Sequence, residues 1–600
     1  MSSLTISVAG AASNAHRDVM RMTEAMTDRS PAWAVVGESA AASAAVGGEN
    51  EEAARAGLRL LDNGIRLAIA GPEWLRRELD PLAQMLDSPD FSLEMIAAIL
   101  AGVSGDAHCA ALVGSRCAVV YRSPMSARPL FYAIRSDRTV LIASRIRGIR
   151  AALPAVGIDM AGLGPFLVPA MCDPSGTAWE GVRRLPPGHA LIVRYGRVTV
   201  REMPPLEALD IEGAVREDLV AEFRRRLLTA VERNSGPPDA VLLSGGIDSA
   251  SLTCAAKAAG LKVRAFSLTY SSPSLAACDE RRFVDDVERS VGVPVTRMPA
   301  DHLLPLLADY PIGDEPEAWT YAARNSAMLR RITSNGSRVS TVIAGEGGDE
   351  LLLGQIFAVA DRHARGDTGG AARELATFPD PVASARIVDG LLAGSYNRHG
   401  TRVIRALADI PPWLSSRYLA DTGLADRLAD GYPQLTQPGH LTIDYSRALI
   451  AEAGAAGRVH CGGWWEDVGR RAGLNITYPF LDPDLATLTW SLPPNMLRDN
   501  GIEKVILRDA LTNELPDSIA ARADKADARA MMHAGLRQAP DQLRCVAHGG
   551  PLVDHAVVDP SKLLTAINEY LAGDDSHGPG LWATVAVNTW MSYHEGDAPS

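Results

Sequence analysis

Apolar and polar side chains alternate in short runs through the first two hundred residues, and the runs end at Pro, Gly or Asp. Segments 117–122, 139–143 and 189–194 show this alternation most clearly, and it is typical of half-buried antiparallel strands. Segments 50–62 and 91–103 show the longer period of an amphipathic helix instead. We therefore expect an N-terminal α+β unit.

A different pattern begins after residue 215. Short apolar runs at 240–243, 263–268, 293–296 and 340–344 alternate with helical segments that begin near residues 248, 280 and 317. Repeated βαβ units of this kind build a parallel, doubly wound sheet, whose ligands lie beyond the carboxyl ends of its strands. From about residue 380 the pattern is mostly helical. The fold class is thus predicted to be α/β, with two domains at 1–210 and 211–600.

Composition and charge narrow the class of protein. A chain of 600 residues with 47% hydrophobic and 22% charged side chains buries several cores. Its net charge of -13 and the lack of a long basic run argue against nucleic-acid binding. No apolar stretch approaches the ~20 residues of a membrane span, and the start does not resemble a secretion signal. Seven scattered cysteines without a Cys-x-x-Cys pair indicate neither disulfides nor zinc. We expect a cytoplasmic protein.

The segment from Ser244 to Ser249 reads Ser-Gly-Gly-Ile-Asp-Ser, follows an apolar run and opens a helix. Gly245 and Gly246 let the backbone approach a ligand closely, while the N–H groups of the helix start attract an anion. Two serine hydroxyls add donors, and Asp248 would hold a divalent cation beside bound phosphates. Two glycines alone would indicate an ordinary turn, but the complete motif in this context predicts a phosphate loop.

This motif resembles the loop of the asparagine synthetase family, which has an ATP-pyrophosphatase fold and cradles the phosphates that leave as pyrophosphate. A second segment, Ala344-Gly-Glu-Gly-Gly-Asp-Glu350, is similar to the family's second loop. The resemblance implies ATP and Mg²⁺ as cofactors, because Mg²⁺ prefers one or two carboxylates together with phosphate oxygens. It assigns the metal to Asp248 and Asp349, and the nucleotide pocket to Leu242, Ser244, Gly245, Gly246, Asp248, Ser249, Leu268, Ala344 and Gly345.

Three later segments match the family in order. Residues 474–484 resemble its Arg-x-Pro-Phe-Leu-Asp segment, with Thr477 in place of the arginine. Residues 501–508 resemble its Lys-x-x-Leu-Arg helix, and residues 522–525 resemble its Arg-x-x-Lys turn. The resemblance implies that Lys525 reaches the departing pyrophosphate. Glu346, in the second loop, is the expected proton acceptor, so the predicted catalytic residues are Glu346 and Lys525.

The N-terminal region also resembles the family. Residues 122–132 and Leu185-Pro-Pro-Gly188 are similar to motifs of its glutaminase-type (Ntn) domain. That domain uses a cysteine that becomes the first residue, whereas this chain begins Met1-Ser2-Ser3 and its first cysteine is Cys109. Ser2 is a nucleophile in principle, but we expect a degenerate, inactive glutaminase-like domain.

A nucleotide site without an ammonia supply implies that the attacking amine belongs to the substrate. Family members with this property include the β-lactam synthetases and the lasso peptide cyclases. The chain length and the bulky pair Trp464-Trp465 favour a cyclase, since paired indoles would grip a peptide; packing of the two side chains in the core is the alternative. Such an enzyme adenylates a side-chain carboxylate of a leader-free precursor peptide and closes a macrolactam in antibiotic biosynthesis, with the pathway's leader peptidase as a second partner. A β-lactam synthetase or another small-substrate enzyme is the alternative, and a noncatalytic nucleotide-binding regulator stays open.

Overall fold

The computed structural model describes most of the chain. The described residues are 3–8, 15–26, 32–36, 42–48, 57–63, 65–70, 79–86, 92–103, 105–114, 116–153, 155–168, 171, 173–236, 239–309, 311–316, 320–334, 338–393, 410–430, 439–453, 462–527 and 529–596.

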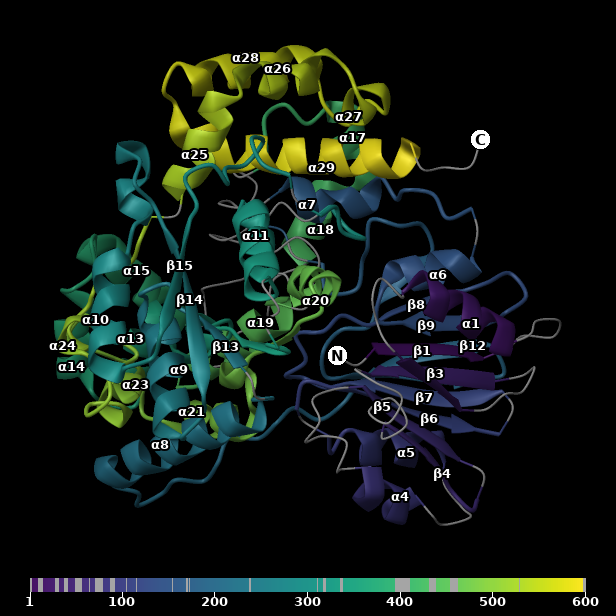
Figure 1. Ribbon diagram of the computed structural model, residues 1–600, viewed down its shortest axis with the longest axis horizontal. Helices are drawn as coiled ribbons and strands as arrows, with labels where there is room; N and C mark the ends of the chain where they lie inside the picture. Colours follow the sequence, from purple (N-terminus) through teal and green to yellow (C-terminus); the bar gives the residue numbers. More distant parts are fainter. Residues whose placement is uncertain are drawn as a thin grey trace.

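Two antiparallel six-stranded sheets form the N-terminal part (Figure 1). The first has the order β10-β8-β9-β1-β3-β2, with β1 at Ser3–Val8, β2 at Ala32–Val36, β3 at Ala42–Gly48, β8 at Phe131–Ile134, β9 at Val140–Ala143 and β10 at Val182–Arg184. The second has the order β12-β11-β7-β6-β5-β4, with β4 at Leu58–Leu60, β5 at Arg66–Ala70, β6 at His108–Val113, β7 at Cys117–Arg122, β11 at His189–Arg194 and β12 at Arg197–Glu202.

Side-chain alternation explains the layers of this part. Ile6 and Val120 pack in the core between the two sheets, whereas Thr5 points away and its hydroxyl lies 3.3 Å from that of Thr23 on α1. The outer faces are covered by α1 (Ala15–Ala25) and α6 (Ile146–Ala152) on one side and by α4 (Leu79–Leu86) and α5 (Leu93–Leu100) on the other. The expected α+β fold class is confirmed.

The helix predicted at 91–103 is present as α5, but the helix predicted at 50–62 is wrong where the structure describes it. Residues Leu58–Leu60 form strand β4, which pairs with β5 through Leu58 and Ala68. The turn is fixed by Asn63, whose side-chain oxygen accepts a hydrogen bond from the Ile65 N–H at 3.1 Å. Pairing with a neighbouring strand therefore overrides the helical spacing here. Residues 50–56 lie outside the described part.

The second half is built on a parallel sheet of order β15-β14-β13-β16-β17. Its strands are β13 (Asp239–Leu242), β14 (Val263–Thr269), β15 (Val295–Pro299), β16 (Thr341–Ile343) and β17 (Asn475–Thr477). Four of these strands were predicted, and β17 was not. The chain winds outward from β13 through β14 to β15, and then returns to β16 on the other side of β13. Such a reversal between β13 and β16 is where open α/β sheets bind ligands.

Helices surround this sheet, as predicted. They include α8 (Arg216–Arg233), α9 (Ile247–Ala258), α10 (Arg281–Val291), α11 (Ala322–Ile332), α12 (Gly348–Leu352), α13 (Gln355–Ala364), α14 (Thr368–Leu375), α15 (Pro381–Leu392), α19 (Leu441–Ala453), α20 (Gly462–Arg471), α21 (Pro483–Ser491), α22 (Pro494–Leu497), α23 (Val505–Ala510) and α24 (Asp517–Ala520). The predicted division at residue 210 falls between β12 and α8 and stays a prediction.

A layer of C-terminal helices lies over both halves, at the top of Figure 1. It contains α25 (Arg529–Gln538), α26 (Pro540–His548), α27 (Pro551–Asp554), α28 (Pro560–Leu571) and α29 (Gly578–Gly596). Trp590 of α29 packs edge-on against Trp179 of the N-terminal part, with ring centroids 5.1 Å apart. One apolar core therefore continues from the C-terminal helices into the N-terminal part.

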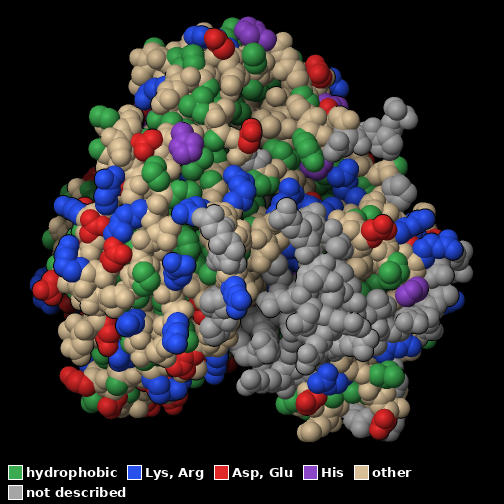
Figure 2. Space-filling model, viewed as in Figure 1, with side chains coloured by type: hydrophobic (Ala, Val, Ile, Leu, Met, Phe, Trp, Pro, Cys, Tyr) green, Lys and Arg blue, Asp and Glu red, His purple; other side chains and the backbone are tan. Residues whose placement is uncertain are grey.

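The surface carries mixed charge. Acidic and basic side chains are intermingled over the described atoms of the face in Figure 2. Among the residues that the structure describes, none of the helices combines the length and the apolar character that crossing a bilayer requires.

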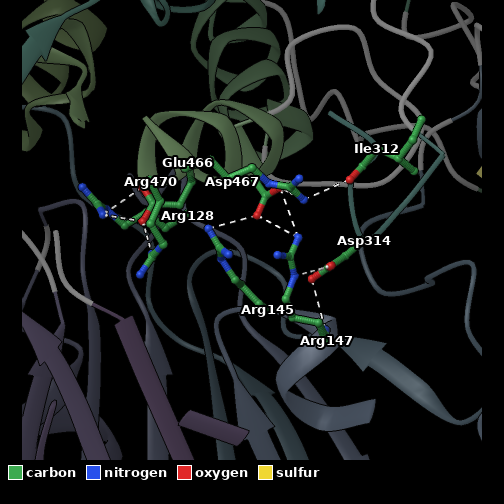
Figure 3. Close-up of polar contacts among 9 residues, drawn as sticks. Arg128, Arg145, Arg147, Ile312, Asp314, Glu466, Asp467 and Arg470 are labelled. Atoms are coloured by element: carbon green, nitrogen blue, oxygen red, sulfur yellow. Dashed lines mark hydrogen bonds and ion pairs between the residues drawn. The ribbon is translucent and has the colours of Figure 1, made fainter. Parts of the chain in front are cut away.

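A buried ionic cluster joins the two halves at helix α20 (Figure 3). Arg128 donates to both oxygens of Glu466 at 3.1 and 3.0 Å and to Asp106 at 2.9 Å. The neighbouring Asp467 accepts ion pairs from Arg145 at 2.9 Å and Arg147 at 3.0 Å. Three arginines of the N-terminal part thus neutralise two adjacent carboxylates of the second half.

The cluster keeps Glu466 ionised although it is buried. Burial alone would raise the pKa of Glu466, but the guanidinium groups of Arg128, Arg470 and Arg145 lower it to about 2. Removing one partner of a buried ion pair leaves a charge without compensation, which costs far more than the loss of an exposed pair.

We expect Arg128→Met to lower the free energy of unfolding by ~3 to 5 kcal/mol, because Asp106 loses its guanidinium partner and Glu466 loses one of the two arginines with which it forms ion pairs. The matched control is Arg59→Met, since Arg59 pairs with Asp80 at 2.9 Å on the exposed surface of the same half; its cost should stay below ~1 kcal/mol. Urea unfolding followed by tryptophan fluorescence compares the two. Equal costs would show that the cluster does not join the halves.

Candidate active site

The predicted phosphate loop lies at the reversal point of the parallel sheet. It connects β13 to α9, and its serines cross-link it: the Ser244 hydroxyl lies 3.0 Å from that of Ser249, which also accepts the Ser244 N–H at 3.1 Å. Gly245 has φ +93°, a conformation that favours glycine. The capping residue of α9, Gly246, offers no side chain to the first N–H groups of the helix. The loop is therefore shaped to bind an anion.

The second predicted loop packs directly against the first. It follows β16, the neighbour of β13. A Cβ added at Gly348 would lie 2.7 Å from Oδ1 of Asp248, so only glycine allows the two loops this approach. Gly347 has φ +93°, and its N–H donates to Glu350 at 3.1 Å. The two acidic loops are held together by close backbone packing.

Lys504 joins the two loops. Its ammonium donates to both oxygens of Asp248 at 2.6 Å and to Asp349 at 2.5 Å. The side chain is buried, and the residue has φ +58°, which is unusual for a residue other than glycine. Lys504 lies in the segment 501–508, which resembles the family's Lys-x-x-Leu-Arg helix, but no role of this lysine was predicted. A backbone held in this region is a signal of function that only coordinates reveal.

The three charges shift one another's pKa values. Burial raises the pKa of Asp248, with Asp349 adding to the rise and Lys504 opposing it. Burial would also raise the pKa of Asp349, but the ammonium groups of Lys504 and Lys525 lower it well below its usual range. Burial disfavours the ammonium of Lys504, yet the two carboxylates raise its pKa. Asp349 and Lys504 are therefore charged at neutral pH.

Lys525 contacts the Asp349 carboxylate from another turn of the chain. Its ammonium contacts Asp349 at 2.8 Å, while more than half of the side chain is exposed. The turn before it is held by Arg508, which donates to the carbonyl oxygens of Ala520 at 2.6 Å and Arg522 at 2.7 Å. Arg522 in turn donates to the carbonyl of Gly245 at 2.9 Å. The conformation of the turn that carries Lys525 is thus tied to the phosphate loop.

The other predicted site residues lie around these loops. Leu242 and Leu268, at or near the ends of β13 and β14, are partly buried against the core. Ala344 is buried, and its N–H donates to the carbonyl of Thr477 on β17 at 3.0 Å. Thr477, which replaces the family's arginine, is buried in that strand. Gly345 approaches Asp248: a Cβ there would lie 3.5 Å from the aspartate's Cβ.

Glu346 is half-buried beside the second loop. Its charge reaches Tyr478, which follows β17: burial raises the pKa of Tyr478 well above its ordinary value, and Glu346, Glu466 and Asp106 raise it further. Glu466 and Asp106 are both partners of Arg128. Glu346 therefore lies on the side of the site that borders the ionic cluster at α20.

The pair Trp464-Trp465 does not line a peptide-binding surface, and that expectation is wrong. Both side chains are 4% exposed and belong to the core under the parallel sheet. Glu466 and Asp467, the next two residues of α20, are buried against the arginines, while the two indole rings pack into the core on other sides of the helix.

The residues present fit a magnesium–nucleotide complex. Two carboxylates, Asp248 and Asp349, both contact Lys504, and Mg²⁺ bound to phosphates takes one or two carboxylates from a protein. Within the described part of the chain, no group of three or more His, Cys, Asp or Glu side chains forms an all-protein metal site. The uncapped start of α9 and the exposed Lys525 supply groups that would bind phosphate oxygens.

Comparison with known families gives two matches. Residues 222–592 match the sequence model described as asparagine synthase, which covers more than half of the chain and includes both loops, Lys504 and Lys525. Residues 111–203 match the one described as a glutamine amidotransferase domain. No curated protein matches the chain.

We expect Lys504→Met to destabilise the protein by ~3 to 5 kcal/mol at pH 7, because two neighbouring carboxylates lose their buried counter-charge. Without the ammonium, the pKa of Asp248 in the folded state rises further above its unfolded value. A carboxyl group whose pKa is higher in the folded state stabilises that state at low pH. The loss of unfolding free energy relative to wild type should therefore shrink as pH falls from about 7 to 4.

Thermal unfolding across this pH range measures the effect. The control is Lys257→Met, since Lys257 is an exposed lysine at the far end of α9 and its change should cost less than ~0.5 kcal/mol. A deficit that did not depend on pH would contradict the assignment of Lys504 as the counter-charge of Asp248 and Asp349.

Proposed function

Because the chain belongs to the asparagine synthase family of ATP-dependent carbon–nitrogen ligases, which release AMP and pyrophosphate, we propose that it is a lasso peptide cyclase. It adenylates a side-chain carboxylate of a leader-free precursor peptide and joins that carbonyl to the peptide's own N-terminal amine. The product is a macrolactam. The pathway's leader peptidase is the partner that would supply the substrate.

The state of the glutaminase-like part supports an amine that comes from the substrate. Its first cysteine, Cys109, is buried in strand β6, and burial raises the pKa of the thiol far above its ordinary value. A thiol held protonated in a core is not a nucleophile. This is the observation on which the choice of an internal amine depends.

The proposed roles follow from charge. Asp248 and Asp349 would hold Mg²⁺, which would neutralise charge on the phosphates. The substrate carboxylate attacks the α-phosphate of ATP and pyrophosphate departs; Lys504 and Lys525 stabilise the charge that grows on it. The amine nitrogen then attacks the acyl carbon, AMP leaves, and the surplus proton of the nitrogen passes to Glu346.

A small-substrate ligase, such as a β-lactam synthetase, is the alternative that keeps every one of these roles. It differs in the molecule consumed with ATP. A noncatalytic nucleotide-binding regulator on the same fold would release no pyrophosphate with any substrate.

We expect pyrophosphate release in the presence of ATP, Mg²⁺ and a linear precursor peptide, without glutamine, and a product lighter than the peptide by one water. Asp248→Ala should lower the rate by at least ~10²-fold, since a carboxylate facing the phosphates is lost. Glu212→Ala is the control, because Glu212 is an exposed acidic residue before α8. A requirement for glutamine, or turnover with small amino acids alone, would refute the peptide cyclase.

We expect Glu346→Gln to slow ring closure by ~10²- to 10⁴-fold and to slow adenylation much less, because a peptide amine with pKa ~8 is already partly neutral. The acyl-adenylate should accumulate, and hydroxylamine should trap it as a hydroxamate. Lys525→Met provides the contrast, since it should slow adenylation itself. If Glu346→Gln reduced both steps equally, the glutamate would belong to the nucleotide site.

A further inference from the structure

An open cavity of about 880 Å³ lies beside the candidate active site. Its walls are α25, the short helix η2 (Pro273–Cys278) that follows β14, and the turn η4 (Asp575–His577) before α29. The lining residues are Ser274, Asp527, Arg529, Ala530, His533, Ala534, Arg537, Gln538, Asp575, Ser576 and Pro579. None of them has a role in the chemistry described above.

The cavity begins within two residues of Lys525. Asp527 lines it, and two residues of chain span at most ~7 Å between their Cα atoms. Asp527 is also fixed to the short helix η2: its N–H donates to the carbonyl of Ala277 at 3.0 Å, and its carbonyl accepts from Cys278 at 3.3 Å. The cavity therefore begins near the turn that carries Lys525, against the helix that follows β14.

The lining mixes polar and apolar side chains, and its formal charges cancel. Arg529 pairs with Asp527 at 2.9 Å, and Arg537 pairs with Asp575. His533 lies 2.9 Å from the hydroxyl of Tyr570. Such a surface lacks the positive excess that phosphates of a nucleic acid require, and its four charged side chains do not suit a lipid chain. Amide groups of a polypeptide match its hydroxyl and amide side chains.

The size and position of the cavity favour a long substrate. Pockets for small molecules measure about 300–1,000 Å³, and this one lies near the upper end of that range. A small amino acid that reacted beside Lys525 would not extend into it. A polypeptide rises ~3.3 Å per residue when extended, so a few residues beyond the reacting carboxylate span the distance.

We propose that this cavity binds the non-reacting segment of a linear peptide substrate, the residues that follow the adenylated side chain. This inference rests on the proposed function and adds the surface that distinguishes a peptide from a small substrate. Binding at the cavity keeps the reacting carboxylate near the bound nucleotide, and the lining, whose formal charges cancel, recognises the peptide backbone with little dependence on sequence.

The test uses the full chain and a defined pool of linear peptides, each with a free amino terminus and one internal glutamate. The peptide that loses one water with ATP and Mg²⁺ is identified by mass, and a shortened form that ends just after its glutamate is prepared. Binding of both peptides, labelled with fluorescein, is measured by anisotropy without ATP, and KM values for peptide and ATP are measured by pyrophosphate release.

Gln538→Trp fills part of the cavity from an exposed position, and Ala534→Trp fills it from a half-buried one. Each should weaken binding of the full-length peptide by about tenfold or more and raise its KM, with the KM for ATP unchanged. Shortening the peptide should weaken its binding to the wild-type protein by the same factor. The shortened peptide should bind a tryptophan variant no more weakly than it binds the wild type, because the truncation and the substitution remove the same contact surface. Gln542→Trp, the same change at an exposed position outside the cavity, is the control.

Additive losses, or full-length binding that neither tryptophan weakens, would overturn the inference. The absence of binding by every peptide in the pool would overturn it as well. A peptide whose binding depends on Gln538 and Ala534 but which never releases pyrophosphate would refute the proposed function and leave the cavity as a peptide site.

Discussion

The contact of Lys504 with Asp248 and Asp349 is the constraint on which the rest of the site depends. Strand order brings two acidic loops to one edge of the sheet, and glycine at position 348 lets their backbones meet. Two carboxylates so close repel each other unless a cation lies between them. The ammonium of Lys504 supplies that cation from a third segment, at the cost of a backbone conformation that residues other than glycine rarely adopt.

Much of the fold was predictable because its signals are local. The alternation at 117–122 and 189–194 predicted strands β7 and β11 with their observed bounds. Each Gly-rich loop is recognisable from a motif of at most seven residues. Strand β17 was missed because it has three residues and is followed at once by Tyr478 and Pro479, so neither its length nor its pattern differs from a loop.

The features that sequence did not reveal depend on contacts between distant segments. Lys504 is separated by 256 residues from Asp248 and by 155 from Asp349, so no spacing rule relates them. The orientation of Trp464 and Trp465 depends on where α20 meets its neighbours. Their aromatic character fits a binding surface and a core equally well, and only the packing of α20 against its neighbours shows that both side chains are buried.

The ionic cluster at α20 has a consequence for how such an enzyme changes during evolution. Arg128, Arg145 and Arg147 lie in one half, and Glu466 and Asp467 lie in the other, where Arg470 and Arg471 of the same helix also pair with them. Each half therefore supplies part of the charge that the other half contacts. Recombination that replaced the N-terminal half with that of a relative would succeed only if the incoming half placed guanidinium groups at the same three points. We therefore expect the two halves to be inherited as one unit. A half that performed no chemistry of its own would still be retained, since its loss would remove three guanidinium groups from buried carboxylates and uncover the apolar core that it shares with the C-terminal helices.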